Sequence, residues 1–322
     1  MNTRLVIAAL LAGLAAPAAF SADSTGAAIS AQPAAPAKGV PVVAAPAATD
    51  AGADAAREAA ALAKVVRLPV AGILAKNADA RGGINAWRSV QALTFSGLMD
   101  AGHERKPPGN RVPGDPHLSK SEQRKARADL VQATAEAKVI QLPFTMDLAR
   151  GRKSRLEIKV KDSTAVQVYD GANGWKVRPY MGNTTPEPFT PEELNAAGAQ
   201  QELDGPLLDA EAKGNKVELE GVEMVEGSPA YKLKVTEKVG AVRRVWIDAS
   251  TFLDVRTDGT RRFDGKERTL YTYFRDWRTV DGVKIPFVQE NKLDGLKDSN
   301  RIVIEKVVVN PKLDANRFAN PS

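Results

Sequence analysis

The chain has 322 residues, with 45 Lys and Arg against 39 Asp and Glu, and a formal net charge of +6. This excess mildly favours anionic partners, but it is too small and too dispersed to indicate nucleic-acid binding. The complete absence of Cys excludes disulfides and thiol nucleophiles, so stability must come from the burial of a core.

The first residues have the pattern of a secretory leader. Met1–Arg4 carries one positive charge, Leu5–Ala16 is apolar, and Ala19-Phe20-Ser21 places small residues where a signal peptidase cleaves. The apolar run is shorter than the roughly 20 residues that a helix needs to span a bilayer. We therefore predict that residues 1–21 are a cleaved signal peptide, with an uncleaved anchor as the alternative. Because no Cys follows the leader, lipid attachment through an N-terminal Cys is excluded.

Residues 22–60 are rich in Ala, Pro and Gly and contain no aromatic residue. Such a segment buries too little apolar area to offset the entropy lost on ordering, so a disordered linker is predicted. Residues 61–322 then form one domain, which is long for a single domain but usual for a large β-sheet with helices.

Helix is expected first in this domain. Pro69–Asn77 and Ile84–Val90 are predicted as two short amphipathic helices, separated by the breaker Gly82-Gly83. A strand follows over Ala92–Met99, with Leu93, Phe95 and Gly97 on one face.

A basic insert at 103–138 then interrupts the pattern and holds both histidines, His103 and His117. Ala, Glu, Lys and Gln favour a polar helix over residues 119–137. The histidines, with Asp115, are ligand types for a metal ion, but their spacing is wrong for a metal site. Solvated side chains are the favoured interpretation.

Alternating apolar residues predict antiparallel strands over most of the remaining chain. Strands are expected near 143–150, 153–161, 164–170 and 174–180, and about seven more from Lys216 to Val309. Asp-Gly pairs supply the positive φ angles of tight hairpin turns, and several fall between apolar runs. The six pairs begin at Asp170, Asp204, Asp258, Asp264, Asp281 and Asp294.

Two further helices are expected between the strands. Thr190 is a good N-cap before Pro191 and two glutamates, which predicts a helix to Leu203, and a second short helix is expected over Pro206–Lys213. The paired glutamates suit a helix dipole better than acid–base catalysis. After the last strand, Pro311–Phe318 is expected to turn back onto the body.

These elements predict an α+β fold that is mainly β. A strongly curved antiparallel sheet would carry helices over its concave face. A broad sheet that closes only partly does not need to fill its interior with its own side chains, so it can leave an apolar hollow.

Several segments match the pattern of one known family. They are Gly82-Gly83 with Trp87 and Val90–Phe95; Glu218–Val222 through Ala230–Leu233; Val245–Asp248 with Leu253 and Arg256; Tyr273–Pro286, the most specific; and Asn310-Pro311 with Leu313, Asp314 and Phe318. Over about residues 80–90 and 140–320 the chain resembles the LolA-like outer-membrane lipoprotein-sorting proteins.

The resemblance implies an incomplete barrel, or half-barrel, of about eleven strands with a helical lid over a lipid-binding cavity. Members of this family carry acyl chains or lipid-modified proteins across the periplasm, or use the cavity in sensing. The lid candidates are Pro69–Val90 and Thr190–Lys213. The insert at 103–138 and the long linker depart from the family pattern, which leaves the cargo and the partners open.

Motifs of common hydrolases are missing, since the sequence has no Gly-x-Ser-x-Gly and no His-Glu-x-x-His. We expect no catalytic residue, cofactor or metal. The candidates for lining a ligand cavity are apolar or aromatic side chains of the strands, for which packed core is an equally good interpretation. They are Phe95, Phe144, Met146, Leu156, Ile158, Val168, Trp175, Trp246, Tyr271, Tyr273 and Phe287.

The sequence thus favours a non-enzymatic periplasmic carrier that binds acyl chains of lipids or lipoproteins for transfer to the outer membrane. Exposing a twelve-carbon chain to water costs roughly 10 kcal/mol, at about 0.8 kcal/mol per methylene, so such a chain must be shielded in transit. The alternative is a periplasmic sensor or regulatory module. The basic insert would steer either protein toward an anionic membrane surface or a membrane-bound partner, unless it is simply a solvated loop.

Overall fold

The computed structural model describes seven stretches of the chain: residues 50–103, 117–135, 138–198, 203–238, 240–263, 266–296 and 299–321. The predicted signal peptide, the linker up to residue 49, the Asp-Gly pair at Asp264 and part of the basic insert lie outside these stretches. Within them, every helix falls short of the length and apolarity that crossing a bilayer requires.

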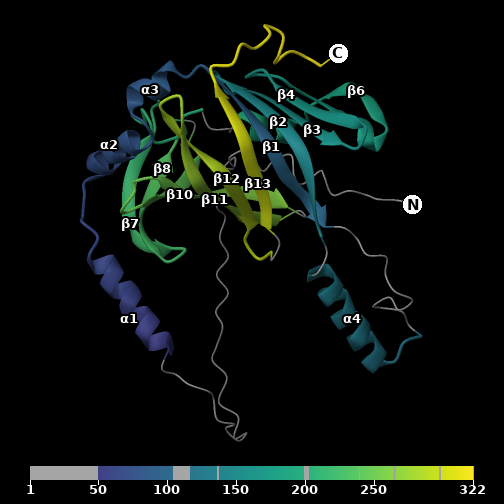
Figure 1. Ribbon diagram of the computed structural model, residues 1–322, viewed down its shortest axis with the longest axis horizontal. Helices are drawn as coiled ribbons and strands as arrows, with labels where there is room; N and C mark the ends of the chain where they lie inside the picture. Colours follow the sequence, from purple (N-terminus) through teal and green to yellow (C-terminus); the bar gives the residue numbers. More distant parts are fainter. Residues whose placement is uncertain are drawn as a thin grey trace, which may run out of the picture.

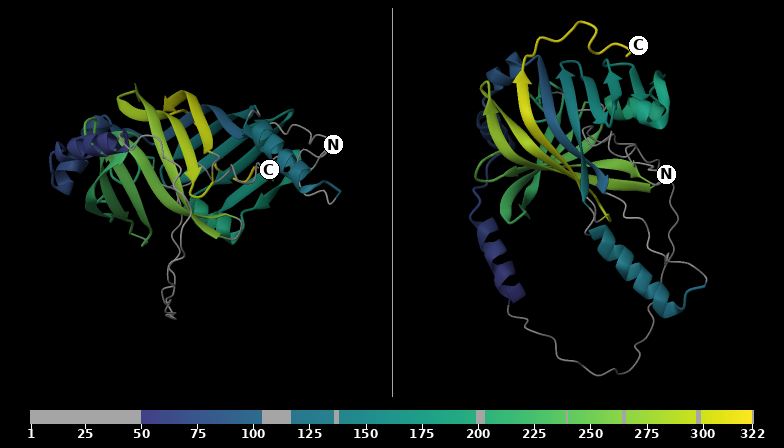
Figure 2. Two further views of the ribbon diagram at one scale, coloured as in Figure 1. Left: turned by 90° about the horizontal axis from the view of Figure 1, so that it is seen from below. Right: turned by 45° about the vertical axis from the view of Figure 1, so that its right-hand side comes forward.

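A single antiparallel sheet of 13 strands forms the body of the described molecule, and it curves strongly without closing (Figures 1 and 2). Its strands are β1 Ala92–His103, β2 Val139–Ala149, β3 Lys153–Val160, β4 Ser163–Tyr169, β5 Gly174–Arg178, β6 Asn183–Pro188, β7 Lys216–Val225, β8 Ser228–Thr236, β9 Val242–Asp248, β10 Asp254–Phe263, β11 Lys266–Val280, β12 Val283–Leu293 and β13 Ser299–Val309. Neighbours in sequence are neighbours in the sheet, except that β1 pairs with β13 and the consecutive strands β6 and β7 form the two edges.

The mainly β fold class and the curved, open sheet are confirmed, but the count of about eleven strands is wrong. The positions of β2–β5 and the seven strands from residue 216 onward agree with the sequence pattern. Strand β6 was not predicted, because it contains Pro186 and Pro188, which cannot donate to a sheet ladder. Its place at an edge, where proline is tolerated, explains how it forms.

Five α-helices lie in the described residues: α1 Asp50–Ala63, α2 Val70–Ala80, α3 Ile84–Ser89, α4 Lys120–Ala135 and α5 Pro191–Gly198. Helices α2 to α4 confirm the predicted ones, and α5 confirms the start of the helix predicted from Thr190, whereas Leu203, its predicted end, lies in a turn. Residues 50–60, which the sequence assigns to the linker, belong to helix α1. This part of the linker is dominated by Ala, which has the highest helix propensity and needs no buried partner to favour helix.

The chain between β6 and β7 must pass from one edge of the sheet to the other. Helix α5 begins this connection with the predicted cap, since Thr190 Oγ1 accepts from Glu193 N at 3.2 Å and Glu193 Oε2 accepts from Thr190 N at 2.8 Å. The helix predicted over Pro206–Lys213 is absent, because this stretch is a series of turns in which Asp209 has a φ of 53°. We call residues 203–214 the crossover segment.

The Asp-Gly pairs behave in three ways. Those at Asp170, Asp281 and Asp294 form turns next to strands, as expected. The prediction of a turn at Asp258 is wrong, because Asp258 and Gly259 lie within β10 and pair with residues of β11. The pair at Asp204 lies in the crossover segment and not in a hairpin.

The two faces of the sheet differ in character. We call the face that carries Phe95 and Ile158 the inner face, and the opposite one the outer face. A first apolar cluster on the inner face includes Trp87, Val90, Leu93, Phe95, Met99, Phe144, Met146, Leu156, Ile158, Val160, Leu208, Val283, Ile285, Phe287, Ile302, Ile304 and Val307. A second cluster, over β8 and β9, consists of Ile73, Leu207, Tyr231, Leu233, Val235, Val245 and Ile247.

The C-terminal tail returns to the outer face, as the sequence predicted. Arg317 pairs with Asp147 of β2 at 2.5 Å and with Glu157 of β3 at 2.9 Å. Asn310 Oδ1 accepts from Gln91 N at 2.6 Å, so the end of β13 is tied to the start of β1.

Candidate functional site

Six of the eleven predicted lining residues lie together on the inner face. Phe95, Phe144, Met146, Leu156, Ile158 and Phe287 belong to the first apolar cluster, and each is at most 7% exposed. They come from four strands, β1, β2, β3 and β12, which are brought together because β1 pairs with both β2 and β13. These six side chains are packed against one another and their neighbours as a buried apolar cluster.

The other five lie on the outer face, away from this cluster. Val168 is paired with Arg155 and with Trp175, and cross-strand partners lie on the same face. Trp246 packs with Val225, Ala230, Val255 and Tyr273, on the side opposite to Val245 and Ile247. Tyr271 lies near the guanidinium of Arg256, 5.3 Å from the ring centroid, beside Trp246. A strand alternates its faces, so a shift of one residue moves an aromatic side chain to the other side.

Polar side chains separate the two apolar clusters on the inner face. Thr257, Thr272 and Asn291 are neighbours across β10, β11 and β12, and Thr272 Oγ1 donates to Asn291 Oδ1 at 2.7 Å. Arg243 of β9, 1% exposed, is paired with Glu237 at 2.5 Å. Burial lowers the pKa of Arg243, against the opposing attraction of Glu237. The inner face is therefore amphiphilic, with two apolar regions divided by polar groups.

The crossover segment bridges the two apolar regions. Leu207, 3% exposed, packs in the cluster over β8 and β9, whereas its neighbour Leu208, 2% exposed, packs in the other cluster. Helices α2 and α3 also contact both clusters: Ile73 of α2 packs in the cluster over β8 and β9, and Trp87 of α3 packs in the first cluster. A segment without regular structure thus contributes to the cover of an apolar surface.

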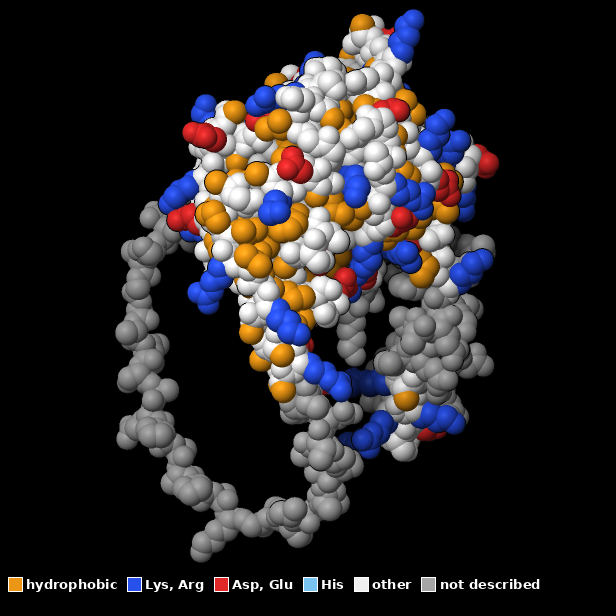
Figure 3. Space-filling view, turned by 60° about the vertical axis from the view of Figure 1, so that its left-hand side comes forward, with side chains coloured by type: hydrophobic (Ala, Val, Ile, Leu, Met, Phe, Trp, Pro, Cys, Tyr) orange, Lys and Arg blue, Asp and Glu red, His pale blue; other side chains and the backbone are white. Residues whose placement is uncertain are grey.

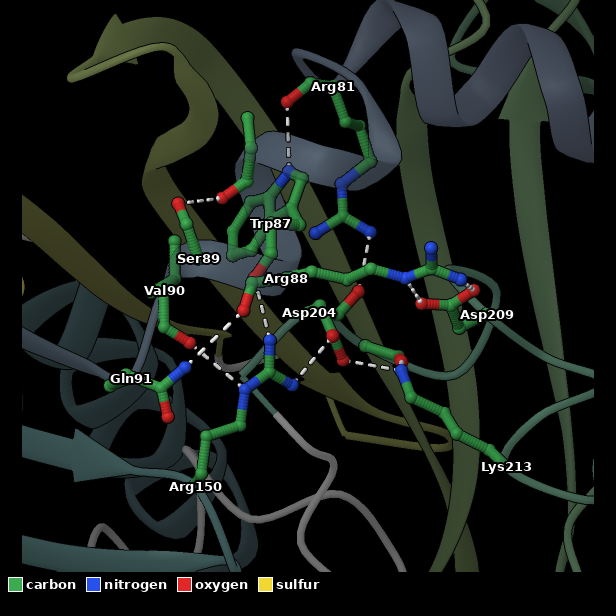
Figure 4. Close-up of polar contacts among 12 residues, drawn as sticks. Arg81, Trp87, Arg88, Ser89, Val90, Gln91, Arg150, Asp204, Asp209 and Lys213 are labelled. Atoms are coloured by element: carbon green, nitrogen blue, oxygen red, sulfur yellow. Dashed lines mark hydrogen bonds and ion pairs between the residues drawn. The ribbon is translucent and has the colours of Figure 1, made fainter.

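Ionic contacts fix this segment in place, and Asp204 is their centre (Figure 4). Its side chain, 5% exposed, accepts from Arg150 Nη1 at 2.7 Å and is paired with Lys213 Nζ. Its carbonyl accepts from Arg81 Nη1 at 2.9 Å. Burial lowers the pKa of Lys213, although Asp204 opposes this shift. We call Arg81, Arg150, Asp204 and Lys213 the latch.

Arg150 connects the latch to helix α3. Its Nη2 donates to Trp87 O at 2.7 Å and its Nε to Val90 O at 3.0 Å. These carbonyls lie at the C-terminal end of α3, where the helix dipole favours a cation. One guanidinium therefore holds both α3 and the crossover segment.

Arg81 connects the latch to helix α2 and to strand β12. Its guanidinium lies 4.8 Å from the ring centroid of Trp87, and its carbonyl accepts from Trp87 Nε1 and from Lys284 N, each at 2.9 Å. The following residue, Gly82, has a φ of 104°, and a Cβ atom there would lie 2.1 Å from Gly282 O. The breaker between α2 and α3 is therefore also a close contact with the β11–β12 turn.

Beneath Arg81 lies a buried carboxylate, Asp254. Asn77 Nδ2 donates to Asp254 Oδ1 at 2.8 Å, and Arg81 Nη1 lies 3.7 Å from Asp254 Oδ2. Burial raises the pKa of Asp254, and the attraction of Arg81 and the hydrogen bond from Asn77 only partly offset this.

Asp254→Asn should change how stability depends on pH. Because the folded-state pKa lies above the unfolded value of about 3.9, ionisation of Asp254 costs free energy only in the folded protein. The free energy of unfolding of the wild type, relative to Asp254→Asn, should therefore fall as the pH rises above about 4, the pKa of an unfolded-state Asp. Urea denaturation of both proteins over this range measures the difference. A difference that stays constant or grows with pH would contradict the assignment.

A second ion pair on the crossover segment lies at the surface. Arg88 donates to Asp209 through Nε and Nη2, both at 2.7 Å, and its side chain is 57% exposed. The hydrogen bond from Arg88 lowers the pKa of Asp209. Exposed pairs of this kind contribute little to stability.

Sequence reasoning missed the latch. Arg81 and Arg150 follow a helix and a strand, where a charged residue is ordinary, and Asp204 was assigned to a turn. The available signal was the spacing of Asp204 and Asp209 beside the apolar pair Leu207-Leu208, in a stretch too rich in Gly and Asp for a stable helix.

In the described residues, no three His, Asp or Glu side chains are grouped as ligands of a metal ion. Of the residues considered for metal binding, Asp115 lies outside the described stretches, and His117 precedes helix α4.

No family model matches the chain, and no curated protein matches it significantly. Solved structures do show similarity. A LolA superfamily protein from Nitrosomonas europaea has 12% identity over 79% of this chain and 99% of its own, with a TM-score of 0.47. A DUF1329 family protein from Desulfovibrio piger has 16% identity over 78% and 98%, with a TM-score of 0.46.

A third similar structure is described as an outer membrane lipoprotein-sorting protein domain from Vibrio parahaemolyticus. It has 11% identity over 77% of this chain and 95% of its own, with a TM-score of 0.43. The first and third of these descriptions name the family that the sequence resembles. At these identities and TM-scores, the similarity carries no ligand, partner or activity to this chain.

Proposed function

We propose that the protein is a non-enzymatic periplasmic carrier that binds acyl chains of lipids or lipoproteins on the inner face of its sheet, for transfer to the outer membrane. Helices α2 and α3 and the crossover segment would cover the concave side as a lid. The observation that carries the proposal is the contact of Leu207 and Leu208 with two separate apolar clusters, on a segment fixed by a polar latch.

Such a lid can be assessed by comparing the free energy of burying its leucines with that of transferring an acyl chain from water. Burying one leucine contributes about 1.5–3 kcal/mol, so Leu207 and Leu208 together hold the segment with about 3–6 kcal/mol. A twelve-carbon chain gains roughly 10 kcal/mol on leaving water. The latch adds the roughly 3–5 kcal/mol of a buried ionic network, so the gain of an acyl chain is comparable with the cost of releasing the segment. The polar groups between the clusters would receive the polar end of the ligand.

Ile158→Thr should weaken acyl binding by about 5- to 30-fold, because it places a hydroxyl in the apolar lining at a cost of about 1–2 kcal/mol. The matched control is Val168→Thr, since both residues are buried and β-branched and lie on opposite faces of neighbouring strands. Each variant is titrated with dodecanoic acid, and bound ligand is counted by native mass spectrometry.

The same measurement on wild-type protein, purified from periplasm without detergent, tests the function itself. Recovered acyl lipid in wild type, reduced in Ile158→Thr but not in Val168→Thr, is the expected result. A stoichiometric protein partner together with an empty cavity would reject carriage and favour the sensor. Equal losses in the two variants would reject the inner face as the binding surface.

A further inference from the structure

A hollow lies where the segment after helix α1 crosses strands β8 and β9. Its volume is about 540 Å³, within the range of about 300–1,000 Å³ of small-molecule sites. It is lined by Ala61, Lys64, Val65, Val66, Leu68, Lys76, Ser228, Pro229, Tyr231, Asp248, Ala249, Ser250 and Phe252. Figure 3 shows hydrophobic side chains gathered where α1 meets the body, with Lys and Arg side chains beside them.

Aromatic side chains form one wall of this hollow. Tyr231 and Phe252 are stacked, with ring centroids 6.1 Å apart. The hydroxyl of Tyr231 donates to Val66 O at 2.6 Å and so holds the segment after α1 against β8. The wall is apolar, with Phe252 half-buried and Tyr231 1% exposed, and the hydroxyl of Tyr231 is already paired.

The charges at the rim are positive. Lys64 and Lys76 are exposed, and neither is in an ion pair with another described residue; Lys76 Nζ lies 5.0 Å from the ring centroid of Phe252. Asp248 also lines the hollow, but its Oδ1 accepts from the backbone and hydroxyl groups of Ser250 and Thr251 at 2.6–3.0 Å. Burial alone would raise the pKa of Asp248, but these hydrogen bonds outweigh it and lower the pKa. The carboxylate is thus engaged in its own turn, while the two ammonium groups remain for a ligand.

We propose that this hollow binds a single-chain anionic amphiphile, with its acidic head group between Lys64 and Lys76 and its hydrocarbon against Tyr231 and Phe252. Charge complementarity selects an anion, and the aromatic wall selects an apolar tail. The hollow borders the second apolar cluster through Tyr231, so the inference rests on the proposed binding at the inner face and adds contacts for the head group. Its walls come from the segment that precedes α2, from Lys76 of α2 and from residues 228–252.

The test uses the full chain and dodecanoic acid that carries a photoreactive diazirine on its alkyl chain. After irradiation, mass spectrometry of peptides locates the crosslinks. We expect labelling within residues 61–76 and 228–252, suppressed by excess dodecanoic acid but not by acetate, which lacks the tail, or by the uncharged dodecyl maltoside.

Two variants make the test specific. Lys64→Gln with Lys76→Gln should weaken labelling of these peptides about five- to tenfold, as expected for two exposed ionic contacts. Lys306→Gln with Lys312→Gln, which makes the same change of net charge at exposed lysines elsewhere, should leave it unchanged. Ala61→Trp, on the half-exposed end of α1, should block the hollow without a change of charge.

Absence of labelling from these peptides, or labelling that Lys64→Gln with Lys76→Gln does not reduce, would overturn the proposal. Labelling confined to β1, β2, β3 and β12, which carry the predicted lining residues of the first apolar cluster, would overturn it and leave the carrier function standing. Labelling of the hollow alone would support it and count against acyl binding at the first apolar cluster.

Discussion

Asp204→Ala should lower the free energy of unfolding by about 3–5 kcal/mol, the cost expected when one partner of a buried ionic network is removed. The residue is 3% exposed, and its carboxylate is the shared partner of Arg150 and Lys213. Without it, two cations remain close together in a largely buried site, and the crossover segment is freed from the inner face. Urea denaturation, followed by tryptophan fluorescence, measures the loss.

The matched control is Asp209→Ala in the same segment. Its partner Arg88 is 57% exposed, so the loss should be about 0–1 kcal/mol. We also expect Asp204→Ala, but not Asp209→Ala, to bind a dye that reports exposed apolar surface under conditions where the protein remains folded. Equal losses of stability in the two variants would show that the latch does not hold the segment.

Gly82→Ala should lower the free energy of unfolding by about 2–6 kcal/mol. A φ of 104° costs about 1–3 kcal/mol for a residue with a side chain, and the new Cβ atom would lie 2.1 Å from Gly282 O. Relief of this clash moves α2 and α3 away from the β11–β12 turn, which adds about 1–3 kcal/mol of overpacking. Thermal and urea denaturation give the change.

Gly83→Ala is the matched control for this clash. Gly83 has a φ of 91°, but nothing lies within 4 Å of a Cβ atom placed there. Gly83→Ala should therefore lower the free energy of unfolding only by the cost of the positive φ angle, about 1–3 kcal/mol. If Gly83→Ala proved as damaging as Gly82→Ala, backbone strain and not the close contact would explain both.

Local sequence signals predicted those elements whose cause is itself local. The cap at Thr190, the breaker at Gly82 and the alternation in β3 and β8 each depend on a few neighbouring residues, and each is confirmed. Strand β6 was not predicted because it contains prolines, which a sheet tolerates only at an edge. Helix α1 was not predicted because its alanines favour helix even without contacts to a core.

The site was harder to predict, since it depends on contacts between distant residues. Tryptophan at position 246 looks like a lining residue from its type alone, but its neighbours Val245 and Ile247 take the inner face. The latch joins positions 81, 150 and 204, which only the folding of the sheet brings together. The alternation of apolar residues along their strands explains why six of the predicted residues share the inner face, and their role as a lining stays a prediction.

Fluorescence quenching by a brominated fatty acid tests the central claim, since tryptophans mark both faces. Two single-tryptophan proteins are needed, one keeping Trp87 of the inner cluster and one keeping Trp246 of the outer face, with the other tryptophans replaced by phenylalanine. Bromine on a bound chain should quench Trp87 and leave Trp246 unaffected. Quenching of Trp246 alone, or saturable binding that quenches neither, would contradict an acyl site on the inner face.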